Sequence, residues 1–251
     1  EDRSDVGARP RLLDEVGGHE LLVARPETPQ HTLALVHHSL TLGVIGHADV
    51  LGAAEEAAAS AERTGVPELV ALSTMCLGRA RLMLGKPAAG LELMRAGLAG
   101  TRAASAHLFT MLSYGFMVVD LYDLARYEDC ERCVDEAMVY GNECEMWFLV
   151  EHLQVYRHRL QALHGEWAAA TAGLREIVGE RREPEKASAR YALAPLATLL
   201  ARQGADGAAE VLGRARDYAR RSDCYHEWML ACFAEIETAV GRHRPDVVLL
   251  N

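Results

Sequence analysis

The chain has 251 residues, half of them hydrophobic and a quarter charged, and its formal net charge at pH 7 is −10. This composition is typical of a globular protein, and its acidic balance argues against the basic surface that phosphate-backbone binding requires. We therefore expect no nucleic acid to be bound by this segment.

Aromatic residues make up 6% of the chain, whereas Ala, Leu, Arg, Glu and Gly are frequent. Such a composition favours helices packed through small side chains, and we predict an all-α fold. No apolar run approaches the roughly 18 residues of a membrane-spanning helix, and the N-terminal residues are polar, unlike a signal peptide. We expect no membrane association, and a cytoplasmic location.

The chain starts with an irregular segment, residues 1–30, which begins with Glu instead of Met. We interpret it as the end of a truncated preceding repeat and the whole sequence as a fragment of a larger protein. From residue 31 to residue 251 one pattern recurs, in which a Gly or Ala ends one helix and the next helix starts within two residues. These anchors are Gly46, Gly85, Ala125, Gly165, Gly204 and Gly241, so that successive anchors are 39, 40, 40, 39 and 37 residues apart.

A fixed period of this size is typical of stacked two-helix hairpins, because each hairpin can bury its apolar face only against the next one. We predict an α-solenoid of about five to six antiparallel hairpins forming one domain, with helix pairs in an irregular bundle as the alternative. The first helices are expected at roughly residues 32–45, 68–84, 104–124, 144–164, 184–202 and 225–240. The second helices are expected at roughly residues 48–63, 88–99, 127–140, 167–180 and 205–221.

Each anchor is expected to adopt a left-handed conformation that ends the first helix. The bulky residue two positions later, such as Tyr127 or Trp167, should fold back against that helix end. A small residue three positions further on, such as Cys130 or Ala170, should let the two helices approach closely. Pro195 falls inside a predicted helix and should kink it or mark an error in the boundary.

With this register, three segments resemble the tetratricopeptide repeat. The matching positions are Leu77, Gly78, Gly85, Pro87, Gly90, Met94, Gly97 and Leu98; Ala125, Tyr127, Cys130, Val134 and Ala137; and Gly165, Trp167, Ala170, Leu174 and Ile177. The period departs from the motif, at about 39 to 40 residues instead of about 34. The resemblance is therefore to a divergent, tetratricopeptide-like array.

Residues 32–240 are also similar to the helical-repeat region of large bacterial ATP-binding transcriptional regulators of the LuxR family. That resemblance implies a sensor or interaction region, since the chain has no phosphate-binding loop and its ending "GRHRPDVVLLN" is too short for a helix-turn-helix. Neither ATP hydrolysis nor DNA binding can be carried over to this chain.

The cysteine spacing and the sequence motifs do not indicate catalysis. Cys130 and Cys133 are two cysteines on one predicted helix, followed by Cys144, and we favour buried thiols over a zinc or redox site. No nucleophile motif or His-Glu-x-x-His occurs, so we predict no catalytic residues, no metal and no cofactor.

Binding is expected in a concave groove lined by the first helices. The predicted groove residues are His38, Tyr114, Trp147, Glu151, Tyr156, Tyr191 and Trp228. Packing between hairpins is the alternative for each of them, because large aromatic side chains at helical spacing more often pack than bind.

Our first hypothesis is a non-enzymatic sensor or scaffold region of a bacterial transcriptional regulator, which binds a protein, a peptide or a small molecule in the groove. The alternatives are a stand-alone adaptor that binds a partner protein or peptide, and a helical enzyme with an unrecognised site. A homodimer is left open.

Overall fold

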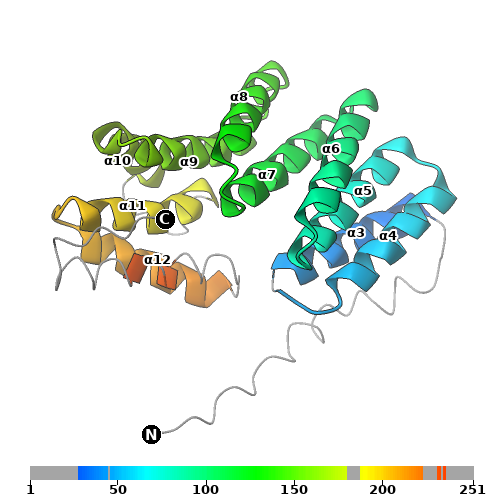
Figure 1. Cartoon of the computed structure of the whole chain (residues 1–251), viewed down its shortest axis with the longest axis horizontal. Coiled ribbons are helices and arrows are strands. Elements are labelled where there is room, and N and C mark those ends of the chain that lie inside the picture. The colour runs from blue at the N-terminus through cyan, green and yellow to red at the C-terminus, as the bar shows by residue number, and fades with distance from the viewer. Residues whose placement is uncertain (1–27, 45, 180–186, 223–230, 233, 236–251) are drawn as a thin grey trace, which may run out of the picture.

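The computed structural model describes residues 28–44, 46–179, 187–222, 231, 232, 234 and 235. Within these residues it contains ten helices and no strand, which confirms the predicted all-α class (Figure 1). The helices are α3 (Pro29–Val44), α4 (Val50–Thr64), α5 (Pro67–Met83), α6 (Pro87–Ala103), α7 (His107–Asp123), α8 (Tyr127–Glu143), α9 (Trp147–Leu163), α10 (Trp167–Val178), α11 (Ala187–Arg202) and α12 (Ala208–Ser222).

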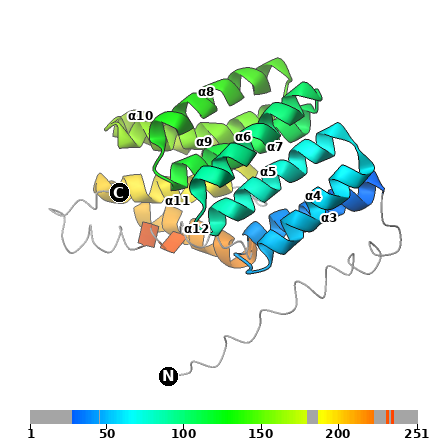
Figure 2. The ribbon, with the colours of Figure 1, turned by 45° about the vertical axis from the view of Figure 1, so that its right-hand side comes forward.

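The helices pack in the order in which they occur along the chain. Each helix from α3 to α11 contacts the one that follows it, and Figure 2 shows the same succession from a second side. The odd-numbered helices also contact one another, α3 with α5, α5 with α7, α7 with α9 and α9 with α11. Among the described residues, no two even-numbered helices make comparable contact.

The predicted helices are found, with boundaries that differ by up to four residues. Helix α8 continues to Glu143, beyond the predicted end at residue 140, and α9 begins correspondingly later than predicted. The cause is Glu145, whose φ of 56° separates these two helices. Helix α11 continues through Pro195, so this residue does not mark a helix end. The helix predicted at residues 225–240 and the segment at 1–27 lie largely or wholly outside the described residues.

Left-handed backbone conformations occur at the anchors, as predicted. The φ angles of Gly46, Gly85, Ala125, Gly165 and Gly204 are 67°, 74°, 55°, 83° and 61°. Gly241 lies outside the described residues.

A second, unpredicted series of left-handed residues follows α4, α6 and α8 and separates each of them from the next odd-numbered helix. It consists of Gly65, Ser105 and Glu145, with φ of 65°, 53° and 56°. These residues are again 40 apart, because 105 − 65 and 145 − 105 are both 40. The backbone therefore reverses at regular intervals from α4 to α10.

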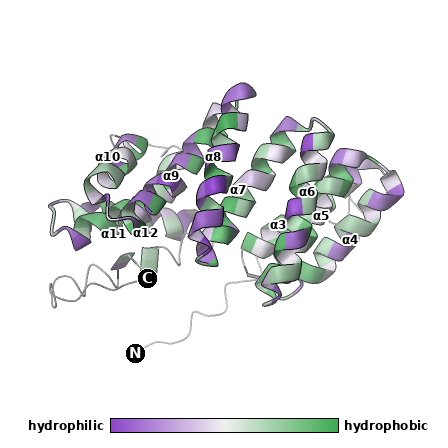
Figure 3. Cartoon of the chain, turned by 45° about the horizontal axis from the view of Figure 1, so that its top comes forward, coloured by the Kyte–Doolittle hydropathy of each residue, from purple (hydrophilic) through white to green (hydrophobic). Residues whose placement is uncertain are grey.

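The core extends along the row of helices. One cluster of buried side chains joins α5, α6, α7, α8 and α9, and a second joins α9 to α10, α11 and α12. Individual helices such as α8 show a hydrophilic stripe beside hydrophobic residues (Figure 3). Apolar burial thus connects successive helices and is the main stabilising term of the array.

The closest helix pair is α5 with α6, which meet through glycines. A Cβ atom added to Gly90 would lie 2.7 Å from the carbonyl oxygen of Gly78, and one added to Gly97 would lie 2.8 Å from backbone atoms of Ala71 and Met75. The buried side chains of Cys130 and Ala170 occupy the position of Gly90 in the following repeats. The expected use of small residues at these crossings is confirmed.

The first turn of α10 folds back onto α9. The indole Nε1–H of Trp167 donates to the carbonyl oxygen of Ala162 at 3.0 Å. In the preceding repeat the ring of Tyr127 packs edge-on against Tyr122, with 5.5 Å between ring centroids. Both contacts join residues five positions apart across the left-handed turn, which confirms the expected role of the bulky residue.

Candidate functional site

Polar and aromatic side chains gather where the odd-numbered helices contact one another. We call this set the aromatic strip, and it comprises Arg79 of α5, Phe116, Asp120 and Tyr122 of α7, His152, Tyr156 and Arg159 of α9, and Arg190 and Tyr191 of α11. Its members make direct contacts across the boundaries between α5, α7, α9 and α11. The strip therefore links helices that are one repeat apart.

An ion pair joins α5 to α7. Arg79 donates from Nε to Oδ2 of Asp120 at 2.8 Å and from Nη2 to Oδ1 at 3.3 Å. The side chains are 14% and 9% exposed, and the guanidinium also lies 4.3 Å from the ring centroid of Phe116. Desolvation by burial opposes the charge of Arg79, but the charge of Asp120, its hydrogen bond and the further interactions with Cys76 and Asp123 together hold the arginine pKa above its ordinary value.

Arg159 joins α7 to α9. Its guanidinium carbon lies 3.9 Å from the ring centroid of Tyr122 and 4.9 Å from that of Tyr156. The two rings contact each other edge to face at 5.7 Å. Asp123, at the end of α7, interacts electrostatically with both Arg159 and Arg79. The positive charge of Arg159 is therefore held by ring faces and by a neighbouring carboxylate.

The strip continues from α9 to α11. The rings of His152 and Tyr191 meet edge to face with 4.3 Å between their centroids, and His152 also contacts Tyr156 at 5.7 Å. Arg190 donates to the hydroxyl oxygen of Tyr191 and to that of Tyr218 on α12, both at 2.9 Å. Because each group is held by a neighbour from another helix, the planar side chains are fixed in orientation.

The predicted groove residues are divided between this strip and other places. Tyr191 belongs to the strip, and Glu151 lies beside it, accepting a 2.6 Å hydrogen bond from the hydroxyl of Ser188. Trp147 is 61% exposed at the start of α9. His38 is half-buried on α3, and Trp228 lies outside the described residues.

Two predicted groove residues are buried in the core. Tyr156 is a member of the strip but is only 1% exposed, so it contributes through its contacts with Tyr122, His152 and Arg159. Tyr114 is completely buried, and its hydroxyl accepts a hydrogen bond from Arg102 on α6 at 2.9 Å. The expectation that these two rings face an open groove is corrected by this burial, which gives both a packing role.

Sequence reasoning missed the charged members of the strip. Arg79 and Asp120 are 41 residues apart, and Ser188 and Glu151 are 37 apart. Both separations are close to one repeat, so the two partners occupy nearby positions on successive odd-numbered helices. Complementary polar residues one period apart were the signal that could have found them.

The cysteines of α8 are core residues, as predicted. Burial raises the pKa of both Cys130 and Cys133 to about 12, which keeps the thiols protonated and unreactive. Among the side chains that the structure describes, no three His, Cys, Asp or Glu residues converge as metal ligands.

The aromatic strip offers stacked planar groups and fixed hydrogen-bond donors, which suit recognition more than bond cleavage. Within the described part of the chain, none of the helices has the length and hydropathy needed to cross a membrane. A scan against protein-family models, a search of curated proteins and a search of solved structures each found no match to this chain.

Proposed function

We propose that the chain is a tetratricopeptide-like solenoid that binds a peptide or small-molecule ligand along the aromatic strip. Two series of left-handed residues, each with a period close to 40, support the solenoid, because they reverse the chain at equal intervals. Each reversal sets the next helix antiparallel to the last, and the odd-numbered helices become the first helices of successive hairpins.

The contacts between helices indicate which face is concave. Odd-numbered helices touch their odd-numbered neighbours, whereas even-numbered helices make no comparable contact in the described residues. In a curved stack, the elements on the inner side lie closer together than those on the outer side. This difference supports a curve whose inner side is formed by the odd-numbered helices, which carry the strip.

The observation that carries the proposal is the continuity of the strip across three helix boundaries. Arg79 bridges α5 and α7, Arg159 bridges α7 and α9, and His152 bridges α9 and α11 through Tyr191. A ligand that competes for one of these guanidinium or ring contacts changes the fit between adjacent hairpins. Binding would thereby bias the curvature of the array and its contacts with other domains.

The larger context follows from the resemblance to the helical-repeat region of bacterial LuxR-family regulators. On that basis the array acts as the non-enzymatic sensor or scaffold of a transcriptional regulator, and ligand binding sets the state of domains encoded beside it. The reading frame on either side of this sequence tests that part, since a regulator would add a phosphate-binding loop upstream and a helix-turn-helix downstream.

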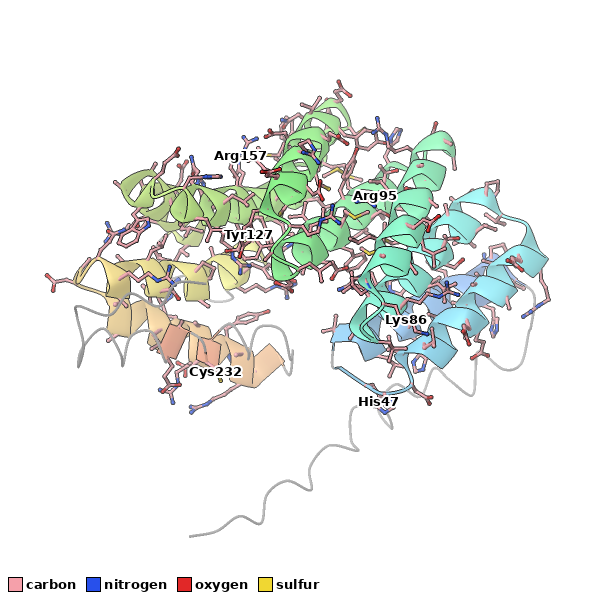
Figure 4. All side chains as sticks on the ribbon, viewed as in Figure 1. His47, Lys86, Arg95, Tyr127, Arg157 and Cys232 are labelled. Carbon is pink, nitrogen blue, oxygen red and sulfur yellow. The ribbon has the colours of Figure 1, made fainter. Side chains whose placement is uncertain are left out.

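Binding is tested by a thermal-shift screen of peptides and metabolites against wild type, Arg159→Gln and Arg157→Gln. Arg157 is the matched control, because it lies on the same helix but pairs with Asp135 of α8 (Figure 4). A ligand at a hundred times its Kd should stabilise wild type by about 2.7 kcal/mol, and Arg157→Gln by the same amount. The stabilisation should fall by at least about half in Arg159→Gln, measured against each variant without ligand.

Ligands that stabilise wild type and Arg159→Gln equally would show that binding does not use the strip. The proposal would then fail for this face, whatever the reading frame encodes on either side.

A further inference from the structure

A second cluster, at the start of α7 and the end of α8, holds a cysteine against a histidine. Cys144 follows the end of α8, and its Sγ lies 3.3 Å from Nδ1 of His107 at the start of α7. The same Nδ1 lies 2.8 Å from the hydroxyl oxygen of Tyr140. The ring of Tyr140 also contacts the imidazole in a tilted arrangement, with 5.9 Å between centroids and 43° between the ring planes. Nδ1 of His107 is therefore shared between the thiol of Cys144 and the hydroxyl of Tyr140, which both belong to the C-terminal end of α8.

This cysteine differs from the buried ones. Cys76, Cys130 and Cys133 are enclosed in the core, and burial raises each pKa to about 12. Cys144 is half-exposed, and its neighbour His107 is exposed. A ring nitrogen within hydrogen-bond reach of a thiol is positioned to accept the thiol proton when the sulfur attacks a substrate.

Arg102 on α6 brings positive charge to this cluster through its contact with Tyr140. Arg102 lies 5.5 Å from the ring centroid of Tyr140 and is held by the hydroxyl of buried Tyr114. Together with Arg95 (labelled in Figure 4), Leu98 and Ala99, it lines a depression of about 340 Å³ on α6. Within the described residues neither arginine forms an ion pair. One carboxylate lies near this region, that of Glu136, which interacts electrostatically with Tyr114 and Cys133.

The depression has the size of a small-molecule site and two unpaired guanidinium groups, in a chain whose net charge is −10. Its charge therefore complements an anionic molecule, which the rest of the acidic surface would repel. The apolar side chain between the arginines, Leu98, can contact the aliphatic part of such a molecule.

We propose that Cys144 is a thiol–disulfide exchange site for small anionic disulfides, with His107 as its base and Arg95 and Arg102 as the anion-recognising groups. His107 accepts the thiol proton, and the Cys144 sulfur attacks one sulfur of the disulfide R–S–S–R. A new S–S bond joins Cys144 to one R–S group as the old S–S bond breaks. The other half leaves as a thiolate and takes the proton from His107, giving R–SH.

The experiment follows mixed-disulfide formation at every cysteine of the full chain by peptide mass mapping. The probes are oxidised glutathione, which carries net negative charge, and cystamine, an aliphatic disulfide with two positive charges. Cys144 should react faster in the native protein than in urea, whereas Cys130 and Cys133 should react only in urea. Cys144 should also prefer oxidised glutathione over cystamine, against the net charge of the chain.

Two variants separate the roles of base and anion recognition. His107→Gln should slow the reaction of Cys144 with both probes by at least about tenfold, because a positioned base is lost. Arg95→Gln should lower the rate ratio of oxidised glutathione to cystamine about two- to fivefold, the range expected for an exposed charge pair. Arg175→Gln, an exposed arginine two repeats further along on α10, is the matched control and should leave that ratio unchanged.

The proposal is overturned if Cys144 reacts more slowly in the native protein than in urea, or if it prefers cystamine. It is also overturned if His107→Gln leaves both rates unchanged. Should His107→Gln fail to fold by circular dichroism, Tyr140→Phe replaces it, since it removes the hydroxyl that shares Nδ1 of His107 with the thiol. An unchanged rate of Cys144 in that variant would count equally against the pair. This inference is independent of ligand binding at the aromatic strip.

Discussion

The left-handed anchors allow the repeat to be tested by exchanging Gly and Ala between repeats. Ala125 occupies an anchor at which the other repeats have Gly, and its φ is 55°. We predict that Ala125→Gly stabilises the protein, whereas Gly85→Ala and Gly165→Ala destabilise it. The two directions of substitution give opposite signs because the same backbone conformation is required at each anchor.

The magnitude follows from two opposing terms. The left-handed conformation costs a residue with a Cβ about 1–2 kcal/mol of free energy. Gly instead costs about 0.5–1 kcal/mol of stability relative to Ala, because it loses more backbone entropy on folding. The difference leaves a net effect of about 0.5–1 kcal/mol for each exchange. Steric contact adds nothing, because a Cβ at Gly85 or Gly165 would meet no atom within 4 Å.

The assay is equilibrium unfolding in urea, followed by circular dichroism and by tryptophan fluorescence to check that both probes report one transition. Gly115→Ala is the control, because Gly115 lies inside α7, where an added Cβ also meets open space. This variant should gain about 1 kcal/mol from helix propensity alone. If Ala125→Gly and Gly85→Ala shifted the unfolding free energy in the same direction, the anchors would not be equivalent and the reasoning would be refuted.

Four further predictions concern packing and burial. Gly97→Ala should lower the unfolding free energy by about 1–3 kcal/mol in the same assay, because its Cβ would lie 2.8 Å from backbone atoms of α5; no loss would refute the close crossing. Trp167→Phe should cost about 1 kcal/mol through the lost hydrogen bond to Ala162, and an unchanged urea midpoint would contradict that contact. Cys130 and Cys133 should resist iodoacetamide at about pH 8 until urea is added, because their pKa values are raised to about 12. The unfolding free energy should also fall as the pH rises from the ordinary thiol value of 9.0 towards about 12, since only the unfolded thiols ionise there; a rise over that range would contradict the burial.

Much of the helical pattern could be predicted because short-range signals set it. Gly at the anchors and Pro67 or Pro87 in the first turn of a helix act within a few residues, and the observed helices begin and end near the predicted positions. The second left-handed series was missed at Ser105 and Glu145, because neither residue type favours that conformation. Packing of the flanking helices imposes it there.

The site was only partly predictable, because its contacts join residues about one repeat apart. Hydrophobic periodicity identified Tyr156 and Tyr191 as residues of the odd-numbered helices, but it could not show that Tyr156 is buried beneath Arg159. The pairing of Arg79 with Asp120 depends on the rotation of α5 relative to α7, which a single helix does not determine. The contact of Cys144 with His107 depends on the same kind of register.

The central claim is that each helix pair is stabilised mainly by the pairs next to it, and hydrogen exchange of the full chain tests it most directly. Gly97→Ala perturbs the crossing of α5 with α6, and exchange measured by mass spectrometry reports the effect on every helix. We predict faster amide exchange from α3 to α7 and unchanged exchange in α11 and α12. A uniform increase over all described helices would contradict the claim, because it would show one shared core.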